Sequence, residues 1–424
     1  MIRSLTALVV LLALLSESAP TAREQLAELR RRAHAARQSG DNAGYLQSAL
    51  KVQTLLNDAP DAIESAAFAY TLAGDTQHAL DALARFADMG QVDDSLSDGS
   101  SKLFAPLAAS PRYKVILDRF ASNKVPVSTA KPAFTVPDAG IVAEDIDYDP
   151  HSKTFLITSI LEHKVLRLTA SGAASDFAQS PSHWPMLAIK VDRSRNLLWA
   201  TEVALDGFTP APKSDWGSSA LLCFELSTGK LLRRIEGPPH SALGDMVLAQ
   251  NGDPILSDGK GGGIYRLLNN DLRLINGQDF ISPQTPALLP DGEHILVPDY
   301  LRGIGKLDLR TGSVEWLGQA PPRNIAVNGI DGLYFDRGTL LLTQNGTSPE
   351  RVIQIKLDPS LTQMTSSSII ERATATLGDP THGVVVGNSF FYIANSGWSE
   401  LDDHGDLKPG SRLTSPQIMQ FKLH

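Results

Sequence analysis

Cysteine is almost absent from this chain of 424 residues, because Cys223 is the single one. One thiol cannot form an intrachain disulfide, so cysteine says nothing about the cellular compartment. Cys223 lies within an apolar strand pattern, and nothing nearby in the sequence would stabilise a thiolate. We therefore expect a buried structural thiol and not a nucleophile.

Basic clusters are also scarce in a chain of net charge -9. The one local run, Arg30 to Arg32, falls in an expected helix with acidic neighbours and is interpreted as a solvated face. Binding to nucleic acid requires grouped Lys and Arg to neutralise phosphates. The composition therefore argues against a nucleic-acid partner.

Long apolar runs are missing beyond the first 22 residues. Residues 1–22 contain Arg3, an apolar stretch from Leu5 to Leu15, and then small and polar residues. This order predicts a secretory signal peptide, with cleavage after Ser18 or Ala22 both open. We expect an exported protein, periplasmic or secreted, without a transmembrane segment in the mature chain; an uncleaved N-terminal anchor is the alternative.

Common catalytic motifs are absent too. The chain has no Gly-x-Ser-x-Gly and no His-Glu-x-x-His, so a serine hydrolase or a zinc protease has no support. The glycine-rich run from Gly259 to Gly263 lies between two expected strands, without a following helix. It therefore predicts a hairpin loop and not a phosphate-binding loop.

A repeated strand pattern dominates residues 139–424. In the stretch Asn328 to Asp358, three strands alternate with a tight turn and a Gly-containing loop. Equivalent residues of the six copies are 43, 57, 40, 47 and 51 residues apart: Glu144, Leu187, Gly244, Gln284, Asp331 and His382. Six copies at this period predict a mainly β fold, a six-bladed β-propeller.

Residues 23–123 show a helical, Ala- and Leu-rich pattern instead. Gly40-Asp41 and Gly74-Asp75 lie 34 residues apart, each at an expected bend between two amphipathic helices. Around the second bend, small and aromatic residues resemble the packing positions of a tetratricopeptide repeat: Ala67, Tyr70, Ala79 and Leu83. The stretch Phe104 to Phe120 predicts a closing helix.

The segment 124–138 contains Pro126, Pro132 and Pro137 and is interpreted as a linker or as the lead-in to the propeller. It is also a candidate for a strand that completes the last blade. The matching strand from the other end of the chain would be Pro416 to His424.

The first strand of each blade lines a central channel, so residues at the starts of these strands should converge. The candidates are Glu144, Leu187, Gly244 or Asp245, Gln284, Asp331 and His382. Oxygen donors from several segments suit Ca²⁺ or another hard divalent cation. Such an ion can polarise the carbonyl of an ester or lactone.

Three phrases in residues 139–424, AEDIDYD, PQTPALLPDGEHILVPD and GIDGLYFDRG, resemble the gluconolactonase and regucalcin (senescence marker protein) superfamily, with paraoxonases and strictosidine-synthase-like proteins as relatives. The resemblance implies a divalent cation, usually Ca²⁺, at the channel mouth. Its implied ligands are a first-blade Glu, two Asn and an Asp before Gly. Glu144 and Asp331 match this pattern, whereas Asp245 and Gln284 stand where the family has the phrases with Asn.

The predicted metal ligands are thus Glu144, Asp331, Gln284 and Asp245, and the predicted catalytic residues are His382 and Asp331. His382 would act as a general base or metal ligand, or else hydrogen-bond to the backbone in the channel. These residues favour an exported, divalent-cation-dependent hydrolase of lactones or related esters. The alternative is a non-catalytic scaffold that binds a protein through the helical repeats, or a small ligand.

Overall fold

The computed structural model describes residues 19–97, 101–208 and 211–423. Most of the predicted signal peptide, residues 1–18, lies outside the described residues, so export stays a prediction. Within the described ranges, none of the helices is long and apolar enough to cross a membrane.

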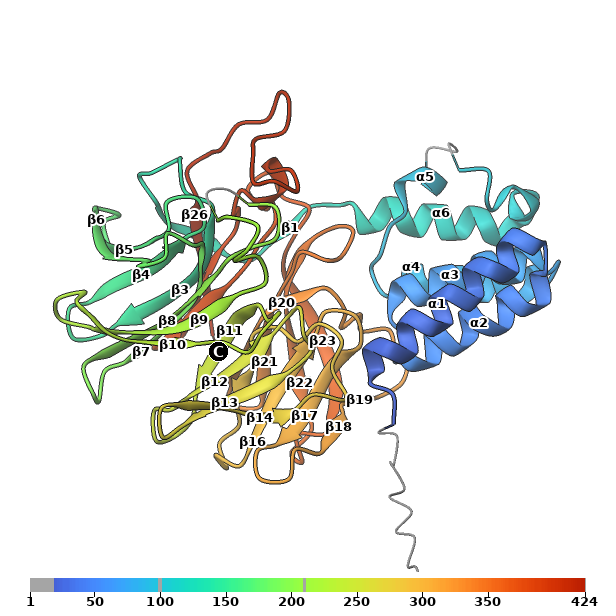
Figure 1. Cartoon of the computed structure of the whole chain (residues 1–424). Helices are drawn as coiled ribbons and strands as arrows, with labels where there is room; N and C mark the ends of the chain where they lie inside the picture. Colours follow the sequence, from blue (N-terminus) through green and yellow to red (C-terminus); the bar gives the residue numbers. More distant parts are fainter. Residues whose placement is uncertain (1–18, 98–100, 209–210, 424) are drawn as a thin grey trace, which may run out of the picture.

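Six antiparallel sheets form a wheel, as the sequence repeat predicts (Figure 1). Each sheet is one blade, numbered in chain order, with its first strand innermost. The first blade consists of β3 (Ala143–Asp149), β4 (Thr154–Ser159), β5 (Lys164–Thr169) and β6 (Ala174–Gln179). The second consists of β7 (Met186–Asp192), β8 (Leu197–Val203), β9 (Ser219–Glu225) and β10 (Leu231–Glu236). The third consists of β11 (Leu243–Leu248), β12 (Pro254–Asp258), β13 (Ile264–Leu268) and β14 (Asp271–Asn276).

The other three blades follow the same order, apart from the last. The fourth blade consists of β15 (Ala287–Leu288), β16 (His294–Asp299), β17 (Gly303–Asp308) and β18 (Val314–Trp316). The fifth consists of β20 (Ile330–Asp336), β21 (Thr339–Gln344), β22 (Arg351–Leu357) and β23 (Gln363–Arg372), with β19 (Gly318–Gln319) beside β23. The sixth contains β24 (Gly383–Val386), β25 (Ser389–Ile393) and β26 (Gln417–Lys422). The Gly259–Gly263 run connects β12 and β13, which confirms the hairpin loop. Cys223 is fully buried in β9, as expected.

Strands from both ends of the chain close the wheel. β2 (Lys131–Thr135) pairs antiparallel with β26 and supplies the fourth strand of the sixth blade. β1 (Val127–Ser128) pairs with the edge of β23 in the fifth blade. The segment 124–138 therefore holds two edge strands, and the prediction that it completes the last blade is confirmed.

Buried hydroxyl groups join neighbouring blades near the axis. Thr158 Oγ1 accepts the N–H of Asp145 at 2.8 Å and donates to the carbonyl of Leu187 in the next blade at 2.7 Å. In the same way, the Ser257 hydroxyl donates to the backbone carbonyl of Gln284 in the following blade. The Thr343 hydroxyl donates to the backbone carbonyl of Thr381. These contacts coincide with irregular strand register, which frees the backbone groups that the hydroxyls satisfy.

The N-terminal segment is helical, with bends at both Gly-Asp pairs. The elements are α1 (Ala22–Ser39), α2 (Asn42–Leu55), α3 (Pro60–Leu72), α4 (Thr76–Asp88), α5 (Asp94–Ser97), a short 3₁₀ turn (Ala105–Leu107) and α6 (Pro111–Asn123). Gly40 and Gly74 adopt left-handed φ angles of 73° and 79°. The side chains of Asp41 and Asp75 accept N–H groups of the next helix, so each pair ends one helix and caps another.

The helices gather on one side of the wheel (Figure 1). Arg351 in β22 donates to the carbonyl of Met89 at 3.0 Å, and Arg302 donates to the carbonyl of Leu55 at 2.9 Å. Ala326 packs within the apolar core of the helices, and Ile281 packs against α1. The helical segment is therefore attached to the fourth and fifth blades.

Candidate functional site

Four of the predicted residues meet at the centre of the wheel: Glu144, Asp245, Asp331 and His382, here called the hub cluster. Each lies within the first three residues of an innermost strand or directly before one. Their exposed fractions are 9%, 4%, 8% and 1%, so all four polar side chains are buried. Buried polar groups at this density must be paired with one another or with the backbone.

His382 is held from both sides of its ring. Nδ1 donates to the backbone carbonyl of Glu144 at 2.6 Å, and Nε2 lies 2.7 Å from Asp245 Oδ1. Because a carbonyl and a carboxylate both accept, each ring nitrogen carries a proton and His382 is an imidazolium. Burial lowers the pKa of His382, but the carboxylates of Asp145, Asp245 and Asp331 outweigh this effect and raise it well above its usual value.

An imidazolium has no lone pair with which to accept a proton or to bind a metal. The predicted roles of His382 as general base or metal ligand therefore conflict with this geometry. The alternative prediction, a hydrogen bond to the backbone in the channel, agrees with it. The ion pair with Asp245 is an additional feature that the sequence does not reveal.

Glu144 and Asp331 each have one oxygen fixed by a neighbouring donor. Trp398 Nε1 donates to Glu144 Oε2 at 2.5 Å, and Asn345 Nδ2 donates to Asp331 Oδ2 at 2.8 Å. Burial, followed by the charge of Asp331, raises the pKa of Glu144 well above its usual value. Burial raises the pKa of Asp331 to about 7, against the opposing charge of His382.

Gln284 does not join the hub cluster. Its side-chain amide donates to the carbonyl and hydroxyl oxygens of Ser282, within the same loop. The next residue, Thr285, points inward instead and donates its hydroxyl to Asp245 Oδ1 at 2.5 Å. The prediction that Gln284 faces inward as a ligand is therefore wrong, and the inward-facing residue is the next one, Thr285.

Two other candidate positions at the strand starts carry no polar side chain into the hub. Leu187 is buried against Val142 and Ile160 in an apolar cluster. Gly244 offers no side chain, and its neighbour Asp245 is the residue that contacts His382. A register irregularity between Leu243 and Asp245 accounts for this shift.

The predicted calcium site is not assembled in this arrangement. Among the described residues, no group of three or more His, Cys, Asp or Glu side chains is placed to hold a metal ion. Asp245 Oδ1 is shared by His382 and Thr285, and Gln284 faces Ser282. Ca²⁺ requires about six to eight oxygen ligands, so these residues as placed do not fit it.

Sequence reasoning missed three residues around the hub cluster. Thr285 and Asn345 contact the carboxylates, and Tyr300 donates its hydroxyl to Asn345 Oδ1 at 3.0 Å. The pair Asn345-Gly346, directly after β21, is a loop signal that marks the end of a strand near the axis.

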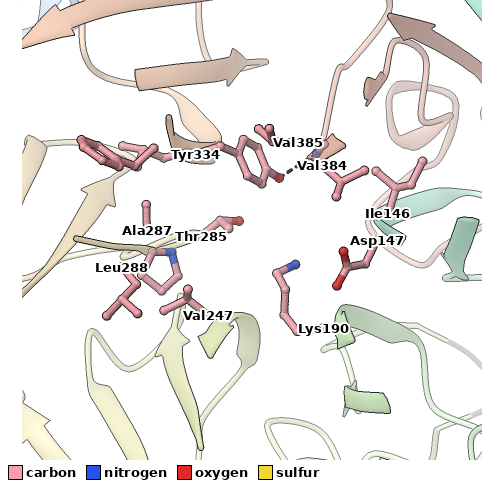
Figure 2. Close-up of a pocket in the computed structure, with 14 residues that line it drawn as sticks. Ile146, Asp147, Lys190, Val247, Thr285, Ala287, Leu288, Tyr334, Val384 and Val385 are labelled. Carbon is pink, nitrogen blue, oxygen red and sulfur yellow. Dashed lines mark hydrogen bonds between the residues drawn. The ribbon is translucent and has the colours of Figure 1, made fainter. Parts of the chain in front are cut away.

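A second group of charged side chains, partly exposed, lies farther along the same strands. Lys190 Nζ donates to Asp145 Oδ2 at 2.6 Å, and the charge of Asp147 also acts on Lys190. Burial lowers the pKa of Lys190, but these carboxylates outweigh it and raise that pKa above its usual value. Lys190, Asp147 and Tyr334 line a cavity on the axis (Figure 2).

No protein-family model and no curated protein sequence matches the chain. Solved structures with a similar fold include a gluconolactonase from Xanthomonas campestris, with 15% identity and a TM-score of 0.46, covering 70% of this chain and 99% of that one. A calcium-binding regucalcin from Agrobacterium tumefaciens has 18% identity and a TM-score of 0.45, over 69% and 96% of the two chains. Virginiamycin B lyase from Staphylococcus aureus has 13% identity and a TM-score of 0.45, over 70% and 88%.

These identities and TM-scores are too low to carry an argument about activity. The wheel itself is established by the six sheets and their order. The chain is a six-bladed β-propeller with a helical N-terminal segment, and its structural neighbours include gluconolactonase-like and regucalcin-like propellers.

Proposed function

We propose that the hub cluster hydrolyses a lactone or a related ester by acid–base catalysis. The observation that carries the proposal is the pair of buried carboxyl groups, Glu144 and Asp331, whose pKa values are both raised. Two carboxyl groups in one buried site cannot easily ionise together, so one keeps its proton near neutral pH. Such a pair supplies one general acid and one general base.

In this mechanism, the Asp331 carboxylate accepts a proton from the attacking water, because its pKa of about 7 suits a base near neutral pH. The water oxygen bonds to the carbonyl carbon and forms a tetrahedral intermediate. Protonated Glu144 then donates its proton to the alkoxy oxygen as the C–O bond breaks. The product is a hydroxy acid from a lactone, or an acid and an alcohol from an open ester.

The surrounding residues position this pair. The indole N–H of Trp398 fixes one oxygen of Glu144, and Asn345, held by Tyr300, fixes one oxygen of Asp331. The imidazolium of His382 balances part of the negative charge nearby. The predicted ligands do not assemble around Ca²⁺, so we assign no step to a cation.

A panel of aliphatic lactones and aryl esters tests the proposal through initial rates between pH 5 and pH 9. We expect kcat/KM to rise with pH as Asp331 ionises near pH 7, and to fall at higher pH as Glu144 loses its proton. Asp331→Asn and Glu144→Gln should each lower kcat by about 100-fold or more. Asp271→Asn, an exposed change on the outer strand β14, is the matched control and should leave the rate unchanged.

A flat pH profile, or full activity in either hub variant, would contradict the proposed roles. A parallel series with millimolar Ca²⁺ or a chelator tests the predicted cation. If Ca²⁺ activates the wild type but not Asp331→Asn, the hypothesis of a cation-dependent hydrolase would be favoured again. The hub side chains would then have to rearrange to bind the ion. Complete absence of turnover in the folded wild-type protein would leave the non-catalytic scaffold as the better interpretation.

A further inference from the structure

A cavity of about 270 Å³ lies on the propeller axis and is lined from all six blades. Its lining residues include Asp147, Lys190, Val247, Leu288, Tyr334 and Val385. They follow the hub cluster along the innermost strands, which run in the same direction around the axis. The cavity is therefore the far part of the channel, beyond His382 and Asp245.

The cavity has mostly apolar walls and is accessible from solvent. Leu288, Phe335 and Val385 are half-buried lining residues, whereas Ala287 and Leu333 are fully buried. Ligand sites usually measure about 300 to 1,000 Å³. A cavity just below this range suits a ligand smaller than a typical drug molecule.

Two donors point into this apolar space (Figure 2). Lys190 Nζ donates to Asp145 Oδ2 at 2.6 Å and to the carbonyl of Ile189 at 2.7 Å, which leaves the third ammonium N–H. The hydroxyl oxygen of Tyr334 accepts the N–H of Gly383 at 2.7 Å. Among the described residues, the hydroxyl proton of Tyr334 has no acceptor.

The local charges select against ionic ligands. A carboxylate ligand would lie against Asp147 of the cavity wall and near Asp145, which pairs with Lys190, and a cationic ligand would face Lys190 itself. Both carboxylate oxygens of Asp147 already accept backbone N–H groups, from Tyr148 at 2.8 Å and Val191 at 2.7 Å. What remains for a ligand is donation from Lys190 and Tyr334 to a neutral oxygen.

We propose that this cavity binds a small neutral amphipathic molecule, a ketone or an alcohol, whose oxygen accepts hydrogen bonds from Lys190 and Tyr334. The apolar body of the ligand packs against the Val and Leu side chains of the walls. This site is separate from Glu144 and Asp331 and does not depend on the proposed hydrolysis. It is a binding site, and no bond is made or broken in it.

Titration calorimetry with 2-octanone as the probe tests the proposal, with octanoate and octylammonium as charged molecules of similar length. We expect 2-octanone to bind at least about tenfold more tightly than either charged molecule. Tyr334→Phe should weaken this binding by about two- to tenfold, because it removes one hydrogen bond. Tyr113→Phe on α6, outside the cavity, is the matched control and should bind normally.

Ala287→Leu fills part of the cavity and should abolish binding, while a thermal unfolding curve verifies that this variant is folded. Glu144→Gln should bind 2-octanone as the wild type does, so failure of the hydrolysis proposal would not affect this result. Undetectable binding by the wild type up to the solubility limit would overturn the proposal. Equal affinity for octanoate, or unchanged affinity in folded Tyr334→Phe and Ala287→Leu, would overturn it as well.

Discussion

At the scale of single residues, His382 decides the charge balance of the hub cluster. Its protonated ring pairs with Asp245, and its two ring nitrogens connect the first blade to the third. The raised pKa values of Glu144 and Asp331 show that negative charge is still costly there. A protonated His382 therefore stabilises both the fold and the ionised form of its neighbours.

Replacing His382 alone should lower the free energy of unfolding more than replacing both partners of the His382–Asp245 ion pair. We expect His382→Ala to lower the free energy of unfolding by about 3–5 kcal/mol, because Asp245 then remains as a buried, unpaired charge. Adding Asp245→Asn should recover part of this loss, since an amide carries no charge. Urea unfolding of both single variants and the double variant measures the coupling, and a double variant no more stable than His382→Ala would contradict the ion pair.

The sequence repeat placed Glu144, Asp331 and His382 at one axis, and the structure brings them together. The prediction failed for Gln284, where Thr285 is the inward residue, because counting along a repeat cannot detect a shift of one position in a loop. It also could not give the protonation state of His382. That state depends on a carboxylate and a carbonyl that lie 137 and 238 residues away in the chain.

At the scale of strands, hydrophobic alternation and turn residues were sufficient to predict the blades. The turn between β20 and β21 is an example, because Arg337 and Gly338 both have positive φ angles, 48° and 81°, as a tight hairpin requires. The contacts between blades were not predictable in this way. From the sequence, a Thr in a strand indicates only that the residue favours β structure. The structure shows in addition that the Thr158 hydroxyl joins two blades.

Thr158 provides a test of this junction. Thr158→Val keeps the shape of the side chain but leaves the N–H of Asp145 and the carbonyl of Leu187 without the hydroxyl. We expect a loss of roughly 2–4 kcal/mol in the free energy of unfolding, since each buried unpaired group costs about 1–3 kcal/mol. Thr158→Ser retains the hydroxyl and is the matched control, which should lose clearly less; equal losses in chemical denaturation would assign the effect to packing.

At the scale of the whole molecule, the helical segment lies against the fourth and fifth blades. Burial raises the pKa of Tyr300, and the charges of Asp331 and of Asp61 at the start of α3 add to this effect. Tyr300 therefore feels charges from both the hub cluster and the helical segment. The sequence predicted the helices and their bends but not their attachment to the wheel. The arginines of the wheel donate mainly to backbone carbonyl groups of the helical segment, and because every residue has a carbonyl, no sequence pattern marks these acceptors.

Arg351 is the strongest candidate for holding the two parts together. It is 5% exposed, and its guanidinium donates to Gln344 Oε1 at 2.8 Å, to the carbonyl of Met89 at 3.0 Å and to the carbonyl of Ala326 at 3.3 Å. Burial lowers its pKa to about 10, with the charge of Arg372 adding to this effect, so the arginine is still charged near neutral pH. Its three oxygen partners come from the helical segment and from the fifth blade and its preceding loop.

Arg351→Met should loosen the helical segment without unfolding the wheel. Of the three hydrogen bonds that this variant removes, only the bond to Met89 joins the helices to the wheel. We therefore expect the attachment to weaken by about 1.5–3 kcal/mol, the usual worth of one hydrogen bond to a charged group. Hydrogen exchange followed by mass spectrometry should then show faster exchange in α3 and α4, with the strands β3 to β5 of the first blade unchanged. Arg310→Met, an exposed arginine after β17, is the matched control. If exchange in Arg351→Met is the same as in the control, the other contacts, among them the Arg302–Leu55 hydrogen bond and the packing of Ala326 and Ile281, hold the helices in place.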